Sequence, residues 1–120
     1  MQSPRDGLLL RAFVGEADRS GGRTLYRTIV DEARIAGLAG ATVLHGPMSF
    51  GACRRVNSEF SVEAPRNPPI VVEIVDTEDR IHAFLPRLDQ LIGSGLVTLE
   101  QIRMFRCGRR TTELSDQAAR

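Results

Sequence analysis

Apolar runs of strand length alternate with amphipathic stretches of helix length along this chain of 120 residues. Apolar residues recur every three or four positions over residues 24–37 and again over residues 78–92, which predicts two helices. Compact apolar runs predict four strands, at 8–14, 41–44, 70–75 and 96–105. The order is strand–helix–strand, then strand–helix–strand, so we expect an α+β fold. Within this class we expect a ferredoxin-like βαββαβ sandwich, with two helices on one face of an antiparallel sheet.

The ends of the two expected helices carry local signals. Gly37 is placed to end the first helix at the C′ position. Thr77 is placed to be the N-cap of the second helix, and Glu78 and Asp79 follow in the first turn, where the helix dipole favours acidic residues. Pro86 removes a backbone hydrogen bond inside that helix, so we expect a kink or a break there.

A long connection separates the second and third expected strands. Residues 56–63 alternate apolar and polar positions, which predicts an extended arm, and the prolines in 65–69 interrupt it. At the other end of the sequence, residues 107–120 lack periodic apolar positions and are expected to form a flexible tail. We therefore expect one domain over 1–120, with its core at about 8–106.

Three polar residues fall inside strands that otherwise read as apolar: Arg11, His45 and Glu73. Because both helices are expected on one face of the sheet, these side chains are assigned to the uncovered face. A small sheet with one open face is commonly covered by association with other subunits, so we expect an oligomer.

Composition excludes several classes of function. The formal net charge is only +1, and aromatic residues make up 5% with no Trp, which does not support nucleic-acid binding. Cys53 and Cys107 lie far apart without metal-ligand spacing, so a zinc site is not expected. No apolar run approaches the roughly 20 residues that span a bilayer, and the N-terminus is not a signal peptide. We expect a cytoplasmic protein without membrane insertion.

Glycines surround the second expected strand, in "GLAGATVLHGPMSFGACRR". Their ordinary explanation is turn chemistry, and the alternative is a backbone that approaches a ligand or forms an anion-binding nest. Arg54 and Arg55 close this segment. They are either solvated loop charges or a guanidinium pair that folds over a phosphate. In the segment "GEADRSGG", Glu16 and Asp18 either cap a loop or belong to a subunit interface or a cation site.

Four segments together resemble a known family: "FVGEADRSGGRTLY", "GLAGATVLHGPMSFGA", "PIVVEIVDTEDRIHAFLPRLDQLI" and "GLVTLEQIRMF". In order and spacing, over about 8–106, they resemble the uncharacterised PII-like family, a domain-of-unknown-function branch of the PII signalling superfamily. The resemblance implies a PII-like fold, a homotrimer, nucleotide sites in the clefts between subunits, and a loop at 46–68 that contacts partner proteins. A membrane transporter or channel is the partner that the superfamily suggests.

The resemblance also implies a set of ligand-binding positions. Thr42 corresponds to the strand residue that faces the adenine pocket. The loop begins at Gly46, and its phosphate-proximal turn contains Gly51 and Ala52. A second glycine loop approaches the phosphates, and one strand arginine is a candidate phosphate contact; these residues are Gly93, Ser94, Gly95 and Arg103.

The sequence departs from PII proteins where they hold a triphosphate. Ala52 and Cys53 stand where PII proteins have Arg-Gln, and Leu96 stands where they have Lys. These departures argue against a sensor of ATP and 2-oxoglutarate. They favour ADP, AMP or a cyclic nucleotide over ATP, or no nucleotide at all.

Three functions are therefore weighed. The first is a non-enzymatic regulatory protein that binds an adenine nucleotide or another small anionic effector at subunit clefts and signals through residues 46–68. The second is a ligand-free trimeric interaction module, which the missing basic residues favour. The third is an enzyme built on His45 and Cys53, which requires a third group to orient the imidazole.

Overall fold

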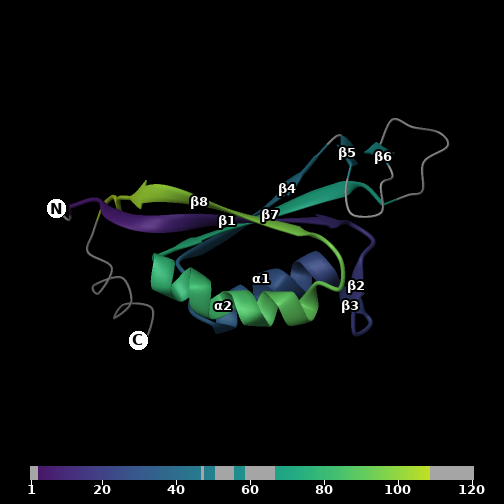
Figure 1. Ribbon diagram of the computed structural model, residues 1–120, viewed down its shortest axis with the longest axis horizontal. Coiled ribbons are helices and arrows are strands. Elements are labelled where there is room, and N and C mark those ends of the chain that lie inside the picture. The colour runs from purple at the N-terminus through teal and green to yellow at the C-terminus, as the bar shows by residue number, and fades with distance from the viewer. Residues whose placement is uncertain (1–2, 47, 51–55, 59–66, 109–120) are drawn as a thin grey trace.

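The computed structural model describes residues 3–46, 48–50, 56–58 and 67–108. Four antiparallel strands form one sheet in the order β4-β7-β1-β8, and two helices lie together on one face of it (Figure 1). This arrangement confirms the expected βαββαβ fold. The bounds of these elements are β1 Arg5–Gly15, α1 Leu25–Ile35, β4 Gly40–His45, β7 Pro69–Asp76, α2 Glu78–Leu91 and β8 Leu96–Met104.

Two short hairpins lie outside the main sheet. Strands β2 (Arg19–Ser20) and β3 (Arg23–Thr24) form the first, in a segment without an expected strand. Its turn is made by Gly21 and Gly22, whose φ values of 56° and 85° match the tight hairpin turns that favour glycine.

The second hairpin pairs β5 (Met48–Phe50) with β6 (Val56–Ser58). It lies within the connection between β4 and β7, beyond the end of the main sheet (Figure 1). Residues 56–58 of the expected arm are thus a strand. Residues 59–63 of the arm and 109–120 of the expected tail lie outside the described residues.

The core lies between the helices and the sheet. Alternate residues of β1 and β7 face the helices because strand side chains point to the two faces in turn. The second helix buries Ile81, Phe84 and Leu88. The other buried apolar residues of this core are Leu8, Leu10, Ala12, Val14, Leu25, Ile29, Ala33, Ile70, Val72 and Ile74.

The connections into the helices use backbone and side-chain caps. Gly37 has a φ of 74° just beyond α1, so its predicted role as the C′ residue is confirmed. Thr77 is the N-cap of α2 as predicted, but its side chain makes no capping hydrogen bond. The buried Asp76 accepts hydrogen bonds from the backbone amides of Thr77 (2.6 Å) and Ala39 (2.9 Å), which ties the start of α2 to the start of β4.

The second helix continues through Pro86, so the break considered from the sequence does not occur. Proline removes the hydrogen bond that the carbonyl of His82, four residues earlier, would accept. Both residues are exposed, so water can satisfy that carbonyl. The buried residues on the opposite side of α2 keep the helix in place.

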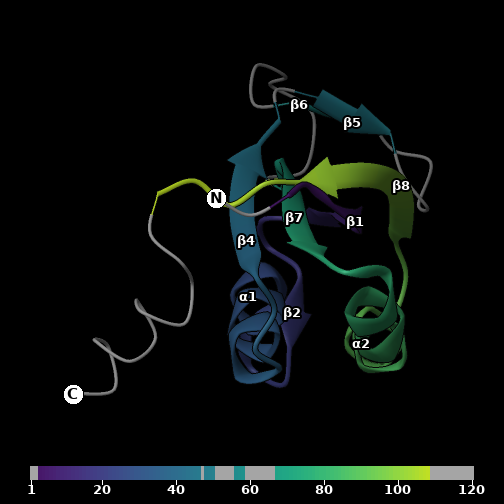
Figure 2. The same cartoon turned by 90° about the vertical axis from the view of Figure 1, so that its left-hand side faces the viewer.

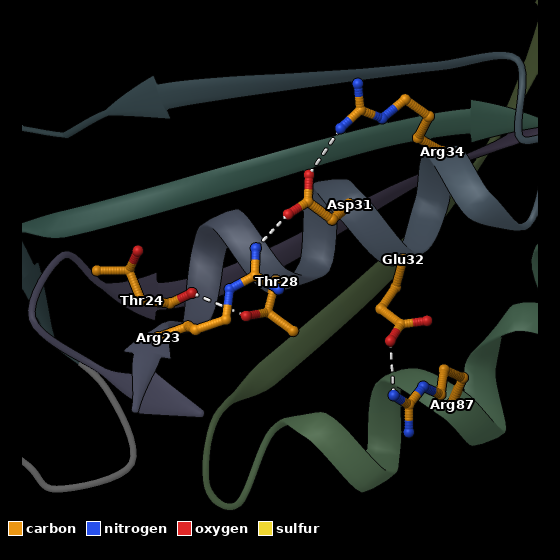
Figure 3. A network of polar contacts seen from close by, with 7 residues as sticks. All are labelled: Arg23, Thr24, Thr28, Asp31, Glu32, Arg34 and Arg87. Atoms are coloured by element: carbon orange, nitrogen blue, oxygen red, sulfur yellow. Dashed lines mark hydrogen bonds and ion pairs between the residues drawn. The ribbon is translucent and has the colours of Figure 1, made fainter. Parts of the chain in front are cut away.

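Ion pairs hold the outer surface of the helix layer (Figure 3). Asp31 lies between Arg23 (2.6 Å) and Arg34 (3.0 Å), and Glu32 of α1 pairs with Arg87 of α2 at 2.6 Å. The hydrogen bond from Arg23 is the main cause that lowers the pKa of Asp31, and Arg87 likewise lowers the pKa of Glu32. These carboxylates are therefore held in their charged form.

No helix of the described residues covers the opposite face of the sheet (Figure 2). At its centre, the Nε atom of Arg11 lies 2.9 Å from Glu73 Oε2, and Nη1 lies 3.5 Å from Glu100 Oε2. The predicted placement of Arg11 and Glu73 on the open face is thus confirmed. His45 was assigned to this face wrongly, because it pairs in register with Ile70, whose side chain faces the core.

Candidate functional site

Four chain segments meet at one end of the sheet, here named the loop end. In the register of the strands, Gly15 is opposite Pro69, His45 is opposite Ile70, and Phe13 is opposite Leu96. The connection 46–68 leaves and re-enters the sheet at this end. The glycine segment 93–95 enters β8 at the same end (Figure 1). Of the positions that the family resemblance singled out, Gly46 and the segment 93–95 therefore lie at the loop end.

On the β4 side, Thr42 and Gly46 are the described candidates. Thr42 lies mid-strand, is exposed, and is opposite Glu73 in register. The amide of Gly46 donates to the carbonyl of Pro69 at 3.0 Å, and a Cβ at Gly46 would lie 3.3 Å from Pro69 Cγ. Packing within the chain thus already favours glycine at position 46.

On the β8 side, a cavity of about 480 Å³ opens beside the glycine segment 93–95. Gly95 has a packing reason, because a Cβ there would lie 3.0 Å from Ile92 and 3.3 Å from the carbonyl of Phe13. Gly93 has no such reason among the described residues: none of their atoms beyond its chain neighbours lies within 4 Å of a Cβ placed on it, and its φ is not left-handed. The cavity is lined by Leu85, Leu88, Asp89, Ile92, Gly93, Ser94, Gly95 and Val97.

Half of the residues that line the cavity have apolar side chains, and one is charged. Asp89 supplies a carboxylate, and none of the described lining residues is Lys or Arg. The described lining residues therefore offer a ligand the backbone of residues 93–95 and the Ser94 hydroxyl, but no cation for a phosphate. Sequence reasoning found the glycine segment, whereas the helix residues that complete the cavity became visible only in the fold.

The two glycine segments lie at the same end of the sheet but on opposite edges (Figure 2). Strand β4 is one edge and β8 is the other, with β7 and β1 between them. Three interstrand spacings separate the edges by roughly 14 Å. Gly46 and the segment 93–95 are therefore not brought together within one chain.

Arg103 lies far from the other candidates. It is opposite Asp6 near the C-terminal end of β8, and its Nε lies 3.5 Å from Asp6 Oδ1. Arg103 is eight positions along the chain from Gly95, which is about 26 Å of extended strand. Within one chain, Arg103 does not share a site with the glycine segments.

The remaining candidates are not placed by the structure. Gly51, Ala52, Arg54 and Arg55 lie outside the described residues. Cys53 also lies outside them, so the proposed pairing of Cys53 with His45 stays untested.

His45 and the acidic residues of the "GEAD" segment form a polar cluster at the loop end. The Nδ1 atom of His45 lies 3.6 Å from Glu16 Oε1. Asp18 Oδ1 accepts a hydrogen bond from the side-chain amide of Asn67 at 3.0 Å. Asn67 was not foreseen as a partner, because 49 residues separate it from Asp18 and no local pattern connects them.

Metal binding and membrane insertion find no support in the described part of the chain. No group of three or more His, Cys, Asp or Glu residues there is arranged to hold a metal ion. Within the same residues, no helix is long and apolar enough to cross a membrane.

Comparisons with known proteins agree with the fold. Residues 7–104 match the model of the DUF190 family, described as "Uncharacterized ACR". A UPF0166 protein of Aquifex aeolicus is 32% identical over 99 residues, covering 81% of this chain and 91% of that protein. A UPF0166 protein of Methanocaldococcus jannaschii is 29% identical over 100 residues, covering 82% and 91%.

Solved PII-like structures share the fold at low sequence identity. A putative PII-like signalling protein of Thermus thermophilus aligns with a TM-score of 0.62 at 15% identity, covering 86% of this chain and 93% of that chain. CPII, a nitrogen regulatory PII-like protein of Thiomonas intermedia, aligns with a TM-score of 0.60 at 16% identity, covering 87% and 92%. That CPII structure is bound to ADP, AMP and bicarbonate.

Proposed function

This chain belongs to the DUF190 family, and we propose that it is a non-enzymatic, PII-like regulatory protein that binds an adenine nucleotide or another small anionic effector. The effector binds at clefts between the subunits of a homotrimer, and the response passes through residues 46–68 to a partner such as a membrane transporter or channel. ADP, AMP or a cyclic nucleotide is favoured over ATP.

The observation that carries this proposal is the cavity beside Gly93. Among the described residues, neither packing nor backbone conformation requires glycine at position 93. A ligand that approaches the backbone there is a physical reason for this glycine. The cavity volume lies within the range of small-molecule sites, and a distant structural relative, CPII, binds adenine nucleotides.

The separation of the glycine segments supports clefts between subunits. Gly46 and the segment 93–95 lie at the same end of the sheet on opposite edges. A second copy that set its β4 edge beside the α2–β8 connection of the first would unite them. It would also bring in cations, which the described lining residues lack, and Arg54 and Arg55 of the 46–68 connection are the candidates.

Calorimetric titration with ATP, ADP, AMP and cyclic nucleotides tests the proposal. We expect ADP or AMP to bind, and Gly93→Ala to weaken that binding by about tenfold or more, because the added methyl occupies space that the ligand needs. The melting temperature should not change, since the methyl contacts nothing in the chain. Gln101→Ala, at an exposed β8 residue outside the cavity, is the matched control and should bind like the wild type. Flat titrations for every nucleotide would reject the nucleotide proposal.

A ligand-free trimeric interaction module is the second candidate, and the chemistry of the cavity favours it. Asp89 repels phosphate, and no lysine or arginine lines the cavity among the described residues. A trimeric mass in sedimentation equilibrium combined with flat nucleotide titrations would support this candidate. Capture of a partner protein should then require residues 46–68 but no added effector.

A further inference from the structure

One short turn contacts both ends of the connection between β4 and β7. The turn follows β1 and comprises residues 15–18. At the start of the connection, Glu16 Oε1 lies 3.6 Å from His45 Nδ1. At its end, the amide of Glu16 donates to the carbonyl of Pro68 at 2.8 Å. The two ends also meet directly, because the amide of Gly46 donates to the carbonyl of Pro69 at 3.0 Å.

Asp18 and Asn67 form the most completely bonded part of this arrangement. Asp18 Oδ2 accepts a hydrogen bond from the amide of Gly15 at 2.8 Å, and Oδ1 accepts one from Asn67 Nδ2 at 3.0 Å. Asn67 Oδ1 in turn accepts a hydrogen bond from the amide of Ala17 at 2.7 Å. A Cβ at position 15 would overlap the Asn67 amide, so glycine at position 15 lets this side chain lie across the turn.

The same turn leads into the helix layer. The carbonyl of Asp18 accepts a hydrogen bond from the amide of Leu25, the first residue of α1, at 2.8 Å. The β2–β3 hairpin lies between these two residues. Asp18 therefore contacts the end of the 46–68 connection through its side chain and the start of α1 through its backbone.

The physical character of the Asp18–Asn67 pair differs from that of the core. Both side chains are only half-buried, so water can replace each hydrogen bond when the pair separates. Regions held by solvent-accessible hydrogen bonds open at lower free energy than the buried strands. A force on residue 67 can therefore release the turn without unfolding the sheet.

We propose that Asp18 and Asn67 are positioning residues that couple the 46–68 connection to the start of α1. Displacement of Asn67 frees Asp18, and with it the hydrogen bonds at Ala17 and Leu25. The coupling itself is a property of the chain. Its use in signalling rests on the function proposed above, in which a partner or effector acts on the 46–68 connection.

A swap of the two side chains tests the coupling. In Asp18→Asn, the two amides cannot accept from Gly15 and Ala17 and also bond to each other, and Asn67→Asp places two carboxylates face to face, so each single substitution breaks a hydrogen bond of this network. In the double variant, the new amide at position 18 donates to the new carboxylate at position 67. That carboxylate can still accept from Ala17, and the amide oxygen at position 18 can still accept from Gly15. The double variant thus retains every hydrogen bond of the pair.

Amide hydrogen exchange followed by NMR is the measurement, with the buried Val72 as the internal reference. In each single variant we expect the exchange rate of the Ala17 amide to rise about tenfold or more, because the hydrogen bond that this amide donates to residue 67 is no longer held by the network. Exchange at Leu25 and Gly46 should rise several-fold if the turn couples both regions. The double variant should return all three amides to within about threefold of the wild type.

Several outcomes would overturn the proposal. In the single variants, the Ala17 amide could exchange faster while Leu25 and Gly46 exchange as in the wild type. That result would show that the pair acts only locally. A double variant that melts like the wild type yet leaves Ala17 unprotected would show that the pair does not hold the turn. If the single variants do not fold, the double variant alone tests the proposal: a folded double variant in which the Ala17 amide exchanges much faster than in the wild type would overturn it.

The failure of this coupling is distinguishable from the failure of the proposed function. Hydrogen exchange requires no ligand, so a coupled turn in a protein that binds no nucleotide refutes only nucleotide binding. Where ADP binds, its affinity should change in Asn67→Asp and recover in the double variant. Unchanged ADP affinity in the single variants, with the turn opened, would refute the signalling use of the coupling.

Discussion

The two faces of the sheet are built differently. On the face toward the helices, alternate residues of β1 and β7 are apolar and buried, and α1 and α2 close over them. On the open face, Arg11 of β1 forms an ion-paired centre with Glu73 of β7 and Glu100 of β8. The first face is completed by the chain itself. The open face carries both charged and apolar side chains, and no helix of the described residues covers it (Figure 2).

The apolar part of the open face is continuous. The strand register aligns Leu44, Val71, Phe13 and Leu96 in one row across all four strands. Three of them are 45%, 39% and 61% exposed, namely Leu44, Phe13 and Leu96. A contiguous exposed apolar row marks an interaction surface, whereas a single exposed residue such as Ile35 on α1 is ordinary. The covered face therefore stabilises the chain, whereas for the open face we expect a role in association.

The largest expected effect comes from the covered face. Leu10 is fully buried, so Leu10→Ala removes packed methyl groups and leaves a cavity. We expect a loss of about 2–5 kcal/mol in the free energy of unfolding, measured by urea denaturation. Phe13→Ala on the same strand is the matched control and should cost less at low protein concentration, where its side chain faces water. Equal losses for the two variants would contradict the difference between the faces.

The next effect concerns association. Phe13→Glu places a charge in the apolar row, so we expect the oligomer to dissociate to monomers in sedimentation equilibrium. Ile35→Glu introduces the same charge on the helix layer, at a residue that is 80% exposed, and should leave the mass unchanged. The proposed role of the open face would be refuted by a wild-type monomer, or by a Phe13→Glu variant that keeps the wild-type oligomer.

The covered face could be predicted from the sequence to a large extent, because alternation of period two and apolar spacing of three to four are local patterns. The local patterns failed where tertiary context decided the outcome. Pro86 is tolerated inside α2 because its side of the helix faces water. His45 was placed on the wrong face because its position depends on the register between β4 and β7.

The candidate site was less predictable. The glycine segments were located by family resemblance, but their placement on opposite edges follows from strand order, which a sequence pattern does not specify. The partnership of Asp18 with Asn67 joins residues that only the folded sheet brings together. Long-range polar contacts of this kind have no local signature, because a carboxylate and an amide are equally common in solvated loops.

The smallest expected effect belongs to the ion pairs of the helix layer, and it depends on pH. The hydrogen bond from Arg23, with a further one from Arg34, lowers the pKa of Asp31 below its ordinary value of 3.8. The folded state thus binds this proton more weakly than the unfolded state, so the pair stabilises the fold above pH 3.8. That stabilisation is lost as the pH falls through the lowered folded pKa.

Asp31→Asn should therefore lower the melting temperature by at most a few degrees at pH 7, because an exposed pair contributes little. The difference from the wild type should narrow steadily as the pH falls below 3.8. High salt should narrow it at neutral pH as well, since screening weakens exposed pairs. Glu73→Gln on the open face is the informative control: if association buries that pair, salt should leave its effect on melting largely unchanged. If salt changes the melting effect of Asp31→Asn and of Glu73→Gln equally, both ion pairs face water. The open face and the helix layer would then differ only in the side chains that they expose.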